Sequence, residues 1–223
     1  MAKTLRSVSL KDKYELDKGV AYMSGIQALT RIPIVQRKRD IAAGLASVTL
    51  LARGRAIGLD LLDGTPHGAW RSFAAMFVAA PFFLALKLLS SPVPAAEVDP
   101  IRLWVAEAIG YVMGWFALPL VMLALARAMH RLHRWPLFVC AWNWTNLFQV
   151  LVFLAGALLA AMLPRGLGQL VTLVTLGYVL WLQWFVAREA LDVPGPRAVA
   201  VVGVDLVLGL FISGLTLSIG LAR

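Results

Sequence analysis

Five long apolar runs follow residue 71, and they constrain the fold more than any other feature of the sequence. Crossing a hydrocarbon core of about 30 Å takes roughly 20 helical residues, and each run is near that length. Helices satisfy their own backbone polar groups within a bilayer, and the alternating pattern of barrel strands is absent. The sequence therefore predicts an all-α polytopic membrane protein, a bundle of five transmembrane helices over 72–90, 103–126, 136–163, 167–187 and 198–222.

The composition agrees with that class of protein. Hydrophobic residues make up 60% of the chain and charged residues 15%, whereas soluble domains have about 45–50% and about 25%. The net charge is +9, and 12 of the 21 Lys and Arg residues lie within residues 1–71. No groove-reading motif and no interleaving of basic and aromatic residues accompanies this charge, so we expect no nucleic-acid partner.

The basic residues also predict the orientation. The segments outside the predicted spans carry 12, 3 and 2 Lys or Arg residues on one side of the membrane and 1, 1 and 1 on the other. Because cytoplasmic segments are enriched in Lys and Arg, the basic N-terminal region is expected in the cytoplasm and the C-terminus outside. The predicted location is the bacterial inner membrane, with multiple passes.

The chain divides into three predicted regions: 1–45, 46–71 and the membrane domain 72–223. Region 46–71 alternates leucines with charged residues. It is interpreted either as an amphipathic helix on the cytoplasmic leaflet or as a connector helix without membrane affinity of its own. The basic cytoplasmic segments are expected to meet anionic lipid headgroups.

Two charged residues lie near the predicted outer ends of the first two spans. Lys87 and Glu107 belong to antiparallel spans and are expected at similar depth. They predict an ion pair within the membrane. The alternative is that each side chain extends separately to the interface.

A second set of polar residues lies about one-third of the way in from the cytoplasmic side. Asn143, Asn146 and Gln149 repeat every three residues along one broad helix face, and Gln183 and Asp205 are expected at a similar depth. The sequence predicts an intramembrane polar cluster of Asn143, Asn146, Gln183 and Asp205. Such a cluster either fixes helix packing through hydrogen bonds or lines a path for a substrate or proton.

Recognisable catalytic constellations are missing. The sequence contains no G-x-S-x-G, no Walker loop and no G-x-G-x-x-G. The single cysteine, Cys140, lies in an apolar run and is interpreted as a small buried hydrophobe. We therefore predict no catalytic residue, no cofactor and no metal site.

Residues 10–45 carry the texts "KDKYELDKG", "GIQALTRIPIVQRKRD" and "AAGL". This segment resembles the extreme N-terminus of the indolepyruvate ferredoxin oxidoreductase family. The resemblance implies a piece of a large cytoplasmic, thiamine-diphosphate-dependent enzyme with iron–sulfur clusters. "AAGL" continues here into "ASVTLLARGRAIG" instead of the family's Gly-rich segment, and one cysteine cannot ligate such clusters. Residues 1–45 are thus interpreted as a poorly ordered enzyme-like fragment, joined by gene fusion or by a reading-frame artefact.

The remainder, residues 46–223, resembles uncharacterised bacterial five-span membrane proteins. In span count, orientation and amphipathic lead-in it is also similar to the Yip family, whose members act with small GTPases in membrane traffic. This similarity is architectural and carries no site residue.

Three functions remain open on the sequence. The first is a non-enzymatic membrane-organising or scaffold protein in the lipid bilayer, with a homo-oligomer or another membrane protein as partner. The second is a small transporter or permease subunit that uses the polar cluster around Asp205. The third is a truncated or fused fragment of indolepyruvate ferredoxin oxidoreductase without activity.

Overall fold

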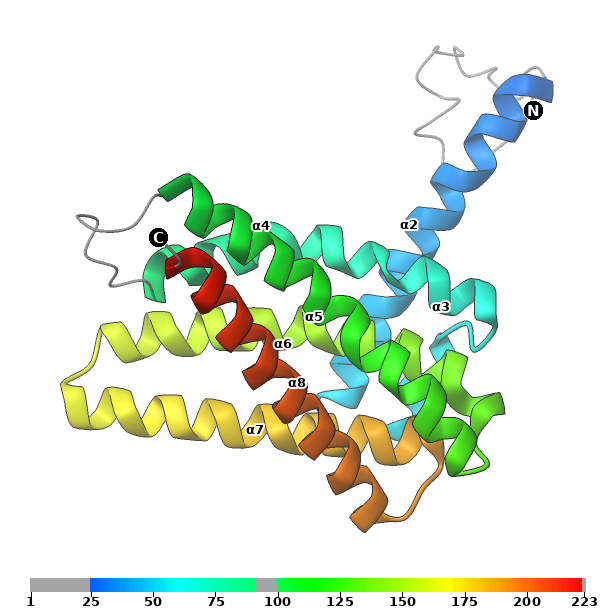
Figure 1. The fold of residues 1–223 in the computed structure, drawn as a ribbon. Helices are drawn as coiled ribbons and strands as arrows, with labels where there is room; N and C mark the ends of the chain where they lie inside the picture. Colours follow the sequence, from blue (N-terminus) through cyan, green and yellow to red (C-terminus); the bar gives the residue numbers. More distant parts are fainter. Residues whose placement is uncertain (1–24, 91–99, 222–223) are drawn as a thin grey trace, which may run out of the picture.

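The computed structural model describes residues 25–90 and 100–221, and within those ranges the chain consists of helices joined by short turns. The long helices are α2 (Gly25–Leu51), α4 (Ala74–Ser90), α5 (Pro100–Ala128), α6 (Trp135–Ala161), α7 (Arg165–Leu191) and α8 (Gly195–Leu221) (Figure 1). The short ones are the 3-10 helices η1 (Ala56–Leu61) and η2 (Leu132–Arg134), and the α-helix α3 (Pro66–Ser72).

Five helical segments are long and apolar enough to cross a membrane. They are Pro66–Leu89, Ile101–Ala128, Leu132–Ala161, Arg165–Leu191 and Gly195–Gly220. The prediction of an all-α chain with five helices of membrane-spanning length is therefore confirmed. Most of these segments begin or end beyond the predicted spans. The prediction followed the apolar residues, whereas the helices continue into polar residues at their ends.

The first of these segments begins six residues earlier than predicted, and its start has a clear local cause. Thr65 is the N-cap of α3, its side chain accepting a hydrogen bond from the Gly68 N–H at 3.1 Å, and Pro66 occupies the first turn. The pKa of Asp63, just before the helix, is lowered mainly by a hydrogen bond with the side chain of Thr65. The segment is interrupted at Phe73, where α3 ends and α4 begins.

The helices pack in a small number of pairs. Helix α6 lies antiparallel beside α7, α5 packs on α8, and α4 packs on α6, while α8 also contacts α7 (Figure 1). Close approach depends on small residues at two crossings. A Cβ on Gly156 of α6 would lie 2.6 Å from Thr175 Oγ1 of α7, and one on Gly110 of α5 would lie 2.4 Å from Thr216 Oγ1 of α8.

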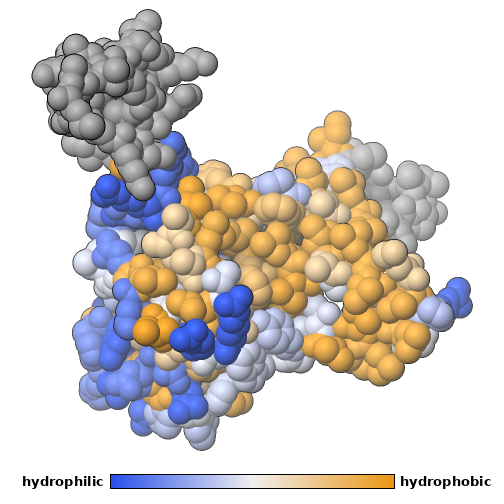
Figure 2. Space-filling view, turned by 180° about the vertical axis from the view of Figure 1, so that it is seen from behind, coloured by the Kyte–Doolittle hydropathy of each residue, from blue (hydrophilic) through white to orange (hydrophobic). Residues whose placement is uncertain are grey.

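The ends of the molecule differ in polarity. The α5–α6 and α7–α8 connections lie at the same end as the start of α3, on the right of Figure 1. Figure 2 shows hydrophilic side chains gathered at that end and along α2, and mostly hydrophobic side chains elsewhere on the visible face. Large apolar side chains such as Val174 and Leu210 point outward. An apolar outer surface of this extent suits lipid rather than water.

Helix α2 joins the region assigned to the enzyme-like fragment with the lead-in region. It is continuous across Leu45 and Ala46, so the predicted boundary falls inside a helix. A Cβ on Gly44 would lie 2.0 Å from Trp144 Cε2, which shows how closely α2 approaches α6. Beyond α2, the Tyr178 hydroxyl of α7 donates to the Ala52 carbonyl at 2.7 Å. For residues 1–24, the prediction of poor order concerns residues outside the described ranges.

Candidate functional site

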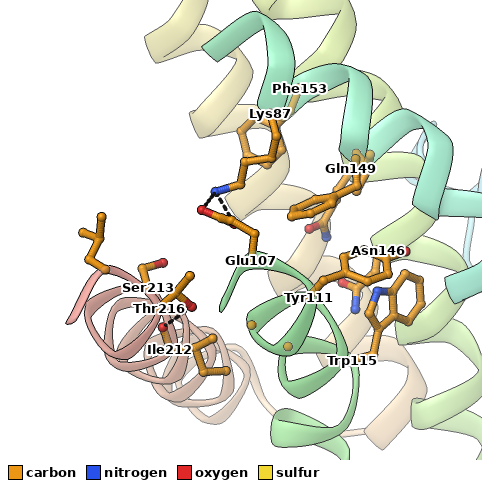
Figure 3. A pocket seen from close by; sticks show the side chains of 15 residues that line it. Lys87, Glu107, Tyr111, Trp115, Asn146, Gln149, Phe153, Ile212, Ser213 and Thr216 are labelled. Atoms are coloured by element: carbon orange, nitrogen blue, oxygen red, sulfur yellow. Dashed lines mark hydrogen bonds and ion pairs between the residues drawn. The ribbon is translucent and has the colours of Figure 1, made fainter. Parts of the chain in front are cut away.

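A cavity of about 390 Å³ lies between α4, α5, α6 and α8 (Figure 3). It occupies the space between two helix pairs, because α5 packs mainly on α8 whereas α4 packs mainly on α6. Its walls are largely apolar and aromatic, and a few polar side chains converge on it. That combination is typical of small-molecule sites in proteins.

The predicted partners Lys87 and Glu107 lie together at this cavity. Lys87 Nζ of α4 is 2.9 Å from Glu107 Oε1 and 2.8 Å from Oε2 of α5, so the structure forms the ion pair (Figure 3). The two side chains are 36% and 20% exposed. Lys87 Nζ also lies 5.7 Å from the ring centroid of Phe83, at a cation–π distance. The charges therefore compensate each other at the rim and leave no net charge there.

Aromatic residues of α4 and α5 form one wall. The ring centroids of Phe83 and Tyr111 are 4.5 Å apart, and those of Tyr111 and Trp115 are 6.1 Å apart. The Tyr111 hydroxyl donates to the Met76 carbonyl at 2.5 Å, which fixes the ring orientation. Gly114 contributes no side chain on the same stretch of α5, and a Cβ there would contact nothing within 4 Å. The missing side chain leaves the space open.

The inner end of the cavity is lined by the amides of Asn146 and Gln149 from α6 (Figure 3). Gln149 is only 6% exposed. Its Oε1 accepts from Gln183 Nε2 at 3.3 Å, but among the described residues its Nε2 has no hydrogen-bond partner. A buried amide donor with no acceptor costs about 1–3 kcal/mol, so a molecule in the cavity that accepts a hydrogen bond from Gln149 would gain binding free energy.

Hydrogen bonds continue from Gln149 away from the cavity. Gln183 Nε2 of α7 also donates to Asp205 Oδ2 of α8 at 2.9 Å. Gln183 and Asp205, predicted to lie together, are thus brought together by the structure. Asp205 itself is not among the residues that line the cavity. The chain Gln149–Gln183–Asp205 therefore links the cavity to the interface between α7 and α8.

Asn143 and Asn146 do not join Gln183 and Asp205 in one cluster. Asn143 is fully buried, and its Nδ2 donates to Ser72 Oγ of α3 at 2.8 Å. Each step of three residues turns a helix by about 60° short of a full turn, so Asn143 and Gln149 point about 120° apart. Asn143 therefore faces α3, whereas Asn146 and Gln149 line the cavity and Gln149 also contacts Gln183.

Several cavity residues were not singled out from the sequence. The depth argument puts Gln149 on the polar face of its span but not in the predicted cluster, and nothing in the apolar run marks Tyr111 or Trp115 as site residues. A signal was present, because Glu107, Gly110, Tyr111 and Gly114 follow the i, i+3, i+4, i+7 spacing of one helix face. A face that combines an acid, two glycines and a tyrosine is unusual for a lipid-facing surface.

The side chains at the cavity can bind a small molecule. It offers an unpaired amide donor, hydroxyls of Ser213 and Thr216, an ion pair and an aromatic wall. Within residues 25–90 and 100–221 no group of three or more His, Cys, Asp or Glu residues is placed to hold a metal ion.

Comparisons of the chain with protein-family models, with curated proteins and with solved structures give no match. The fold and the site themselves define the class: an all-helical protein with five helices of membrane-spanning length and apolarity, carrying a polar-lined cavity between four of them. Any more specific function follows from the geometry of that cavity.

Proposed function

We propose that the chain is a five-span protein of the bacterial inner membrane, with a cytoplasmic N-terminus and an outer C-terminus, that binds a small amphipathic molecule in the cavity. It acts as a small transporter or permease subunit and catalyses no reaction. The observation that carries this proposal is Gln149, a buried amide at the inner end of the cavity whose Nε2 donor has no partner among the described residues.

The shape of the cavity supports an amphipathic ligand. At the rim, Ser213 and Leu217 of α8 are exposed and Lys87 of α4 is half-buried, so the opening lies between α8 and α4. A molecule dissolved in the bilayer can enter there sideways. Its acceptor group would then meet Gln149, and its apolar part would contact Phe83 and Trp115.

The depth of the cavity supports a role in movement across part of the membrane. Glu107 and Trp115 are eight residues apart on α5, which corresponds to about 12 Å along the helix. The cavity therefore extends from the end opposite the basic segments to about the middle of a 30 Å core. The positive-inside rule assigns that end to the outer side.

The N-terminal similarity to a thiamine-diphosphate enzyme is not proposed to confer activity. The similar segment ends at residue 45, inside α2, and α2 packs on α6 of the membrane domain at Gly44. This packing supports one membrane protein rather than an enzyme remnant. Measuring thiamine diphosphate and iron in the purified chain tests this part, and stoichiometric amounts of either would contradict it.

The binding proposal is tested with octanamide and octanoate as probes on the purified full chain in nanodiscs, using octane as the apolar reference. We expect octanamide and octanoate to bind more tightly than octane. Gln149→Leu should weaken the binding of both by about five-fold, the loss of one hydrogen bond. The matched control is Gln169→Leu, an exposed glutamine of α7 outside the cavity, which should leave binding unchanged.

Equal binding by the wild type and the Gln149→Leu variant would overturn the proposal. So would failure of both polar probes to bind. A cavity that takes up no ligand would favour the first of the three functions open on the sequence, a membrane-organising or scaffold protein.

A further inference from the structure

A second recess, of about 500 Å³, lies away from the cavity, between α2 and the α3–α4 segment. Its α2 side is charged, with Arg37 and Asp40, and its α3–α4 side is aromatic, with Trp70, Phe73 and Phe77. We call it the α2 groove. It belongs to the end of the molecule that carries most of the basic residues, and it shares no lining residue with the cavity.

The acidic residue of the α2 groove is already neutralised. Asp40 accepts hydrogen bonds from Arg71, through Nε at 2.7 Å and also through Nη2, and from Gln36 Nε2 at 3.0 Å. Arg71 Nη1 is in addition 3.8 Å from Asp63 Oδ2. These contacts hold α2 in place over α3 and use up the negative charge of Asp40.

The basic residues of α2 beside Asp40 are not neutralised. Arg37, Lys38 and Arg39 are exposed, and none has an acidic partner within the part of the chain that the structure describes. Only Arg37 of these three lines the α2 groove. At its charged side the groove therefore presents the guanidinium of Arg37, which has no acidic partner among residues 25–90 and 100–221, with further positive charge next to it.

The opposite side carries three aromatic rings next to His67 and Arg71. Trp70 is 69% exposed and Phe77 is 65% exposed. Phe73 between them is fixed by stacking on Phe116 of α5, with ring centroids 4.6 Å apart. Residues 70, 73 and 77 follow helical spacing, so they form one stripe that runs from α3 into α4 along the first membrane-spanning segment.

We propose that the α2 groove binds one anionic phospholipid of the cytoplasmic leaflet. The phosphate pairs with Arg37, and an acyl chain lies along Trp70, Phe73 and Phe77. Such a lipid has an anionic group at the membrane surface and hydrocarbon beneath it. The groove offers the same order of partners, a guanidinium at the membrane boundary and an exposed aromatic stripe beside it.

Native mass spectrometry of the purified full chain in detergent tests the site, with dioleoyl phosphatidylglycerol as probe and dioleoyl phosphatidylcholine as the neutral reference. We expect one phosphatidylglycerol to bind at least five-fold more tightly than phosphatidylcholine. Arg37→Gln should reduce this affinity by about five- to ten-fold. The matched control is Lys38→Gln, which removes the same charge from the adjacent position of α2 but does not line the groove, and its effect should stay within two-fold.

A second variant examines the apolar side. Phe77→Ala should weaken binding of the dioleoyl lipid but leave the thermal unfolding temperature without lipid close to that of the wild type, because the ring is exposed. Inorganic phosphate at millimolar concentration should not displace the lipid.

Three results would overturn the proposal. Equal losses in Arg37→Gln and Lys38→Gln would mean that only the overall charge of α2 attracts the lipid. Full displacement by inorganic phosphate would reduce the site to a phosphate site without an acyl chain. A protein dimer that Phe77→Ala dissociates, with no bound lipid in the wild type, would assign the groove to a second copy of the chain. None of these results bears on the Gln149 site.

Discussion

Charged and amide side chains within the apolar helices make their contacts mainly with other helices. Lys87 of α4 pairs with Glu107 of α5, Gln183 of α7 with Asp205 of α8, and Asn143 of α6 with Ser72 of α3. Each bond therefore ties together two segments that are distant in sequence. Polar groups in this setting specify which helices are neighbours, while the apolar side chains around them would fit many arrangements.

The Lys87–Glu107 pair allows a test at the level of single residues. Glu107→Gln removes the carboxylate and leaves the Lys87 ammonium without its partner, so we expect a loss of about 1 kcal/mol in unfolding free energy for a partly exposed pair. The exchanged double variant Lys87→Glu/Glu107→Lys should recover most of it. Thermal unfolding in detergent measures both losses. If the losses of the two single variants simply add up in the double variant, the pair does not stabilise the fold.

The sequence predicts some of these partners and not others, for a geometrical reason. Depth follows from counting residues along antiparallel helices, and this counting places Lys87 near Glu107 and Gln183 near Asp205. Which way a side chain points around the helix axis depends on packing angles that the sequence does not display. Asn143 is at the expected depth but faces α3, and Gln149, deeper in the bilayer, takes the place expected for it beside Gln183.

At the scale of elements, the long helices follow from the apolar runs, whereas α2 does not. Its sequence mixes basic, polar and apolar residues, so no periodic signal marks it as a helix packed on the bundle. The decisive features are local: Gly44 meets the indole of Trp144, and Asp40 meets Arg71. The same limitation applies to α3, whose start depends on the Thr65 cap rather than on hydropathy.

The attachment of α2 is tested by adding one methyl group. Gly44→Ala would place a Cβ 2.0 Å from a ring atom of Trp144, a buried side chain. We expect α2 to shift or detach, with a loss of about 1–3 kcal/mol from overpacking. The control is Gly177→Ala in α7, where the new methyl group contacts nothing within 4 Å. If the unfolding temperature falls equally in both variants, close packing at Gly44 is contradicted.

At the scale of the whole molecule, the alternation of basic and weakly charged connections predicts one orientation. Leu132, in the α5–α6 connection, and Met162, the C-cap of α6, are both exposed and lie at opposite ends of α6. In a Cys140→Ser background, Leu132→Cys should react with an impermeant maleimide only from the cytoplasmic side. Met162→Cys should react only from the outer side. The reverse pattern in right-side-out vesicles would invert the topology and place the cavity opening in the cytoplasmic half.

The position of Cys140 has a consequence for measurement. The only thiol of the chain is buried in a small recess that α2 covers with Asp40 and Ala43. We expect a small maleimide to reach it when α2 moves away from α6 and α3. When α2 opens and closes faster than the thiol reacts, the ratio of the alkylation rate of Cys140 in the native protein to that of an unprotected thiol gives the free energy of this opening. An occupied α2 groove should slow it, because lipid that bridges α2 and α4 keeps the cover closed.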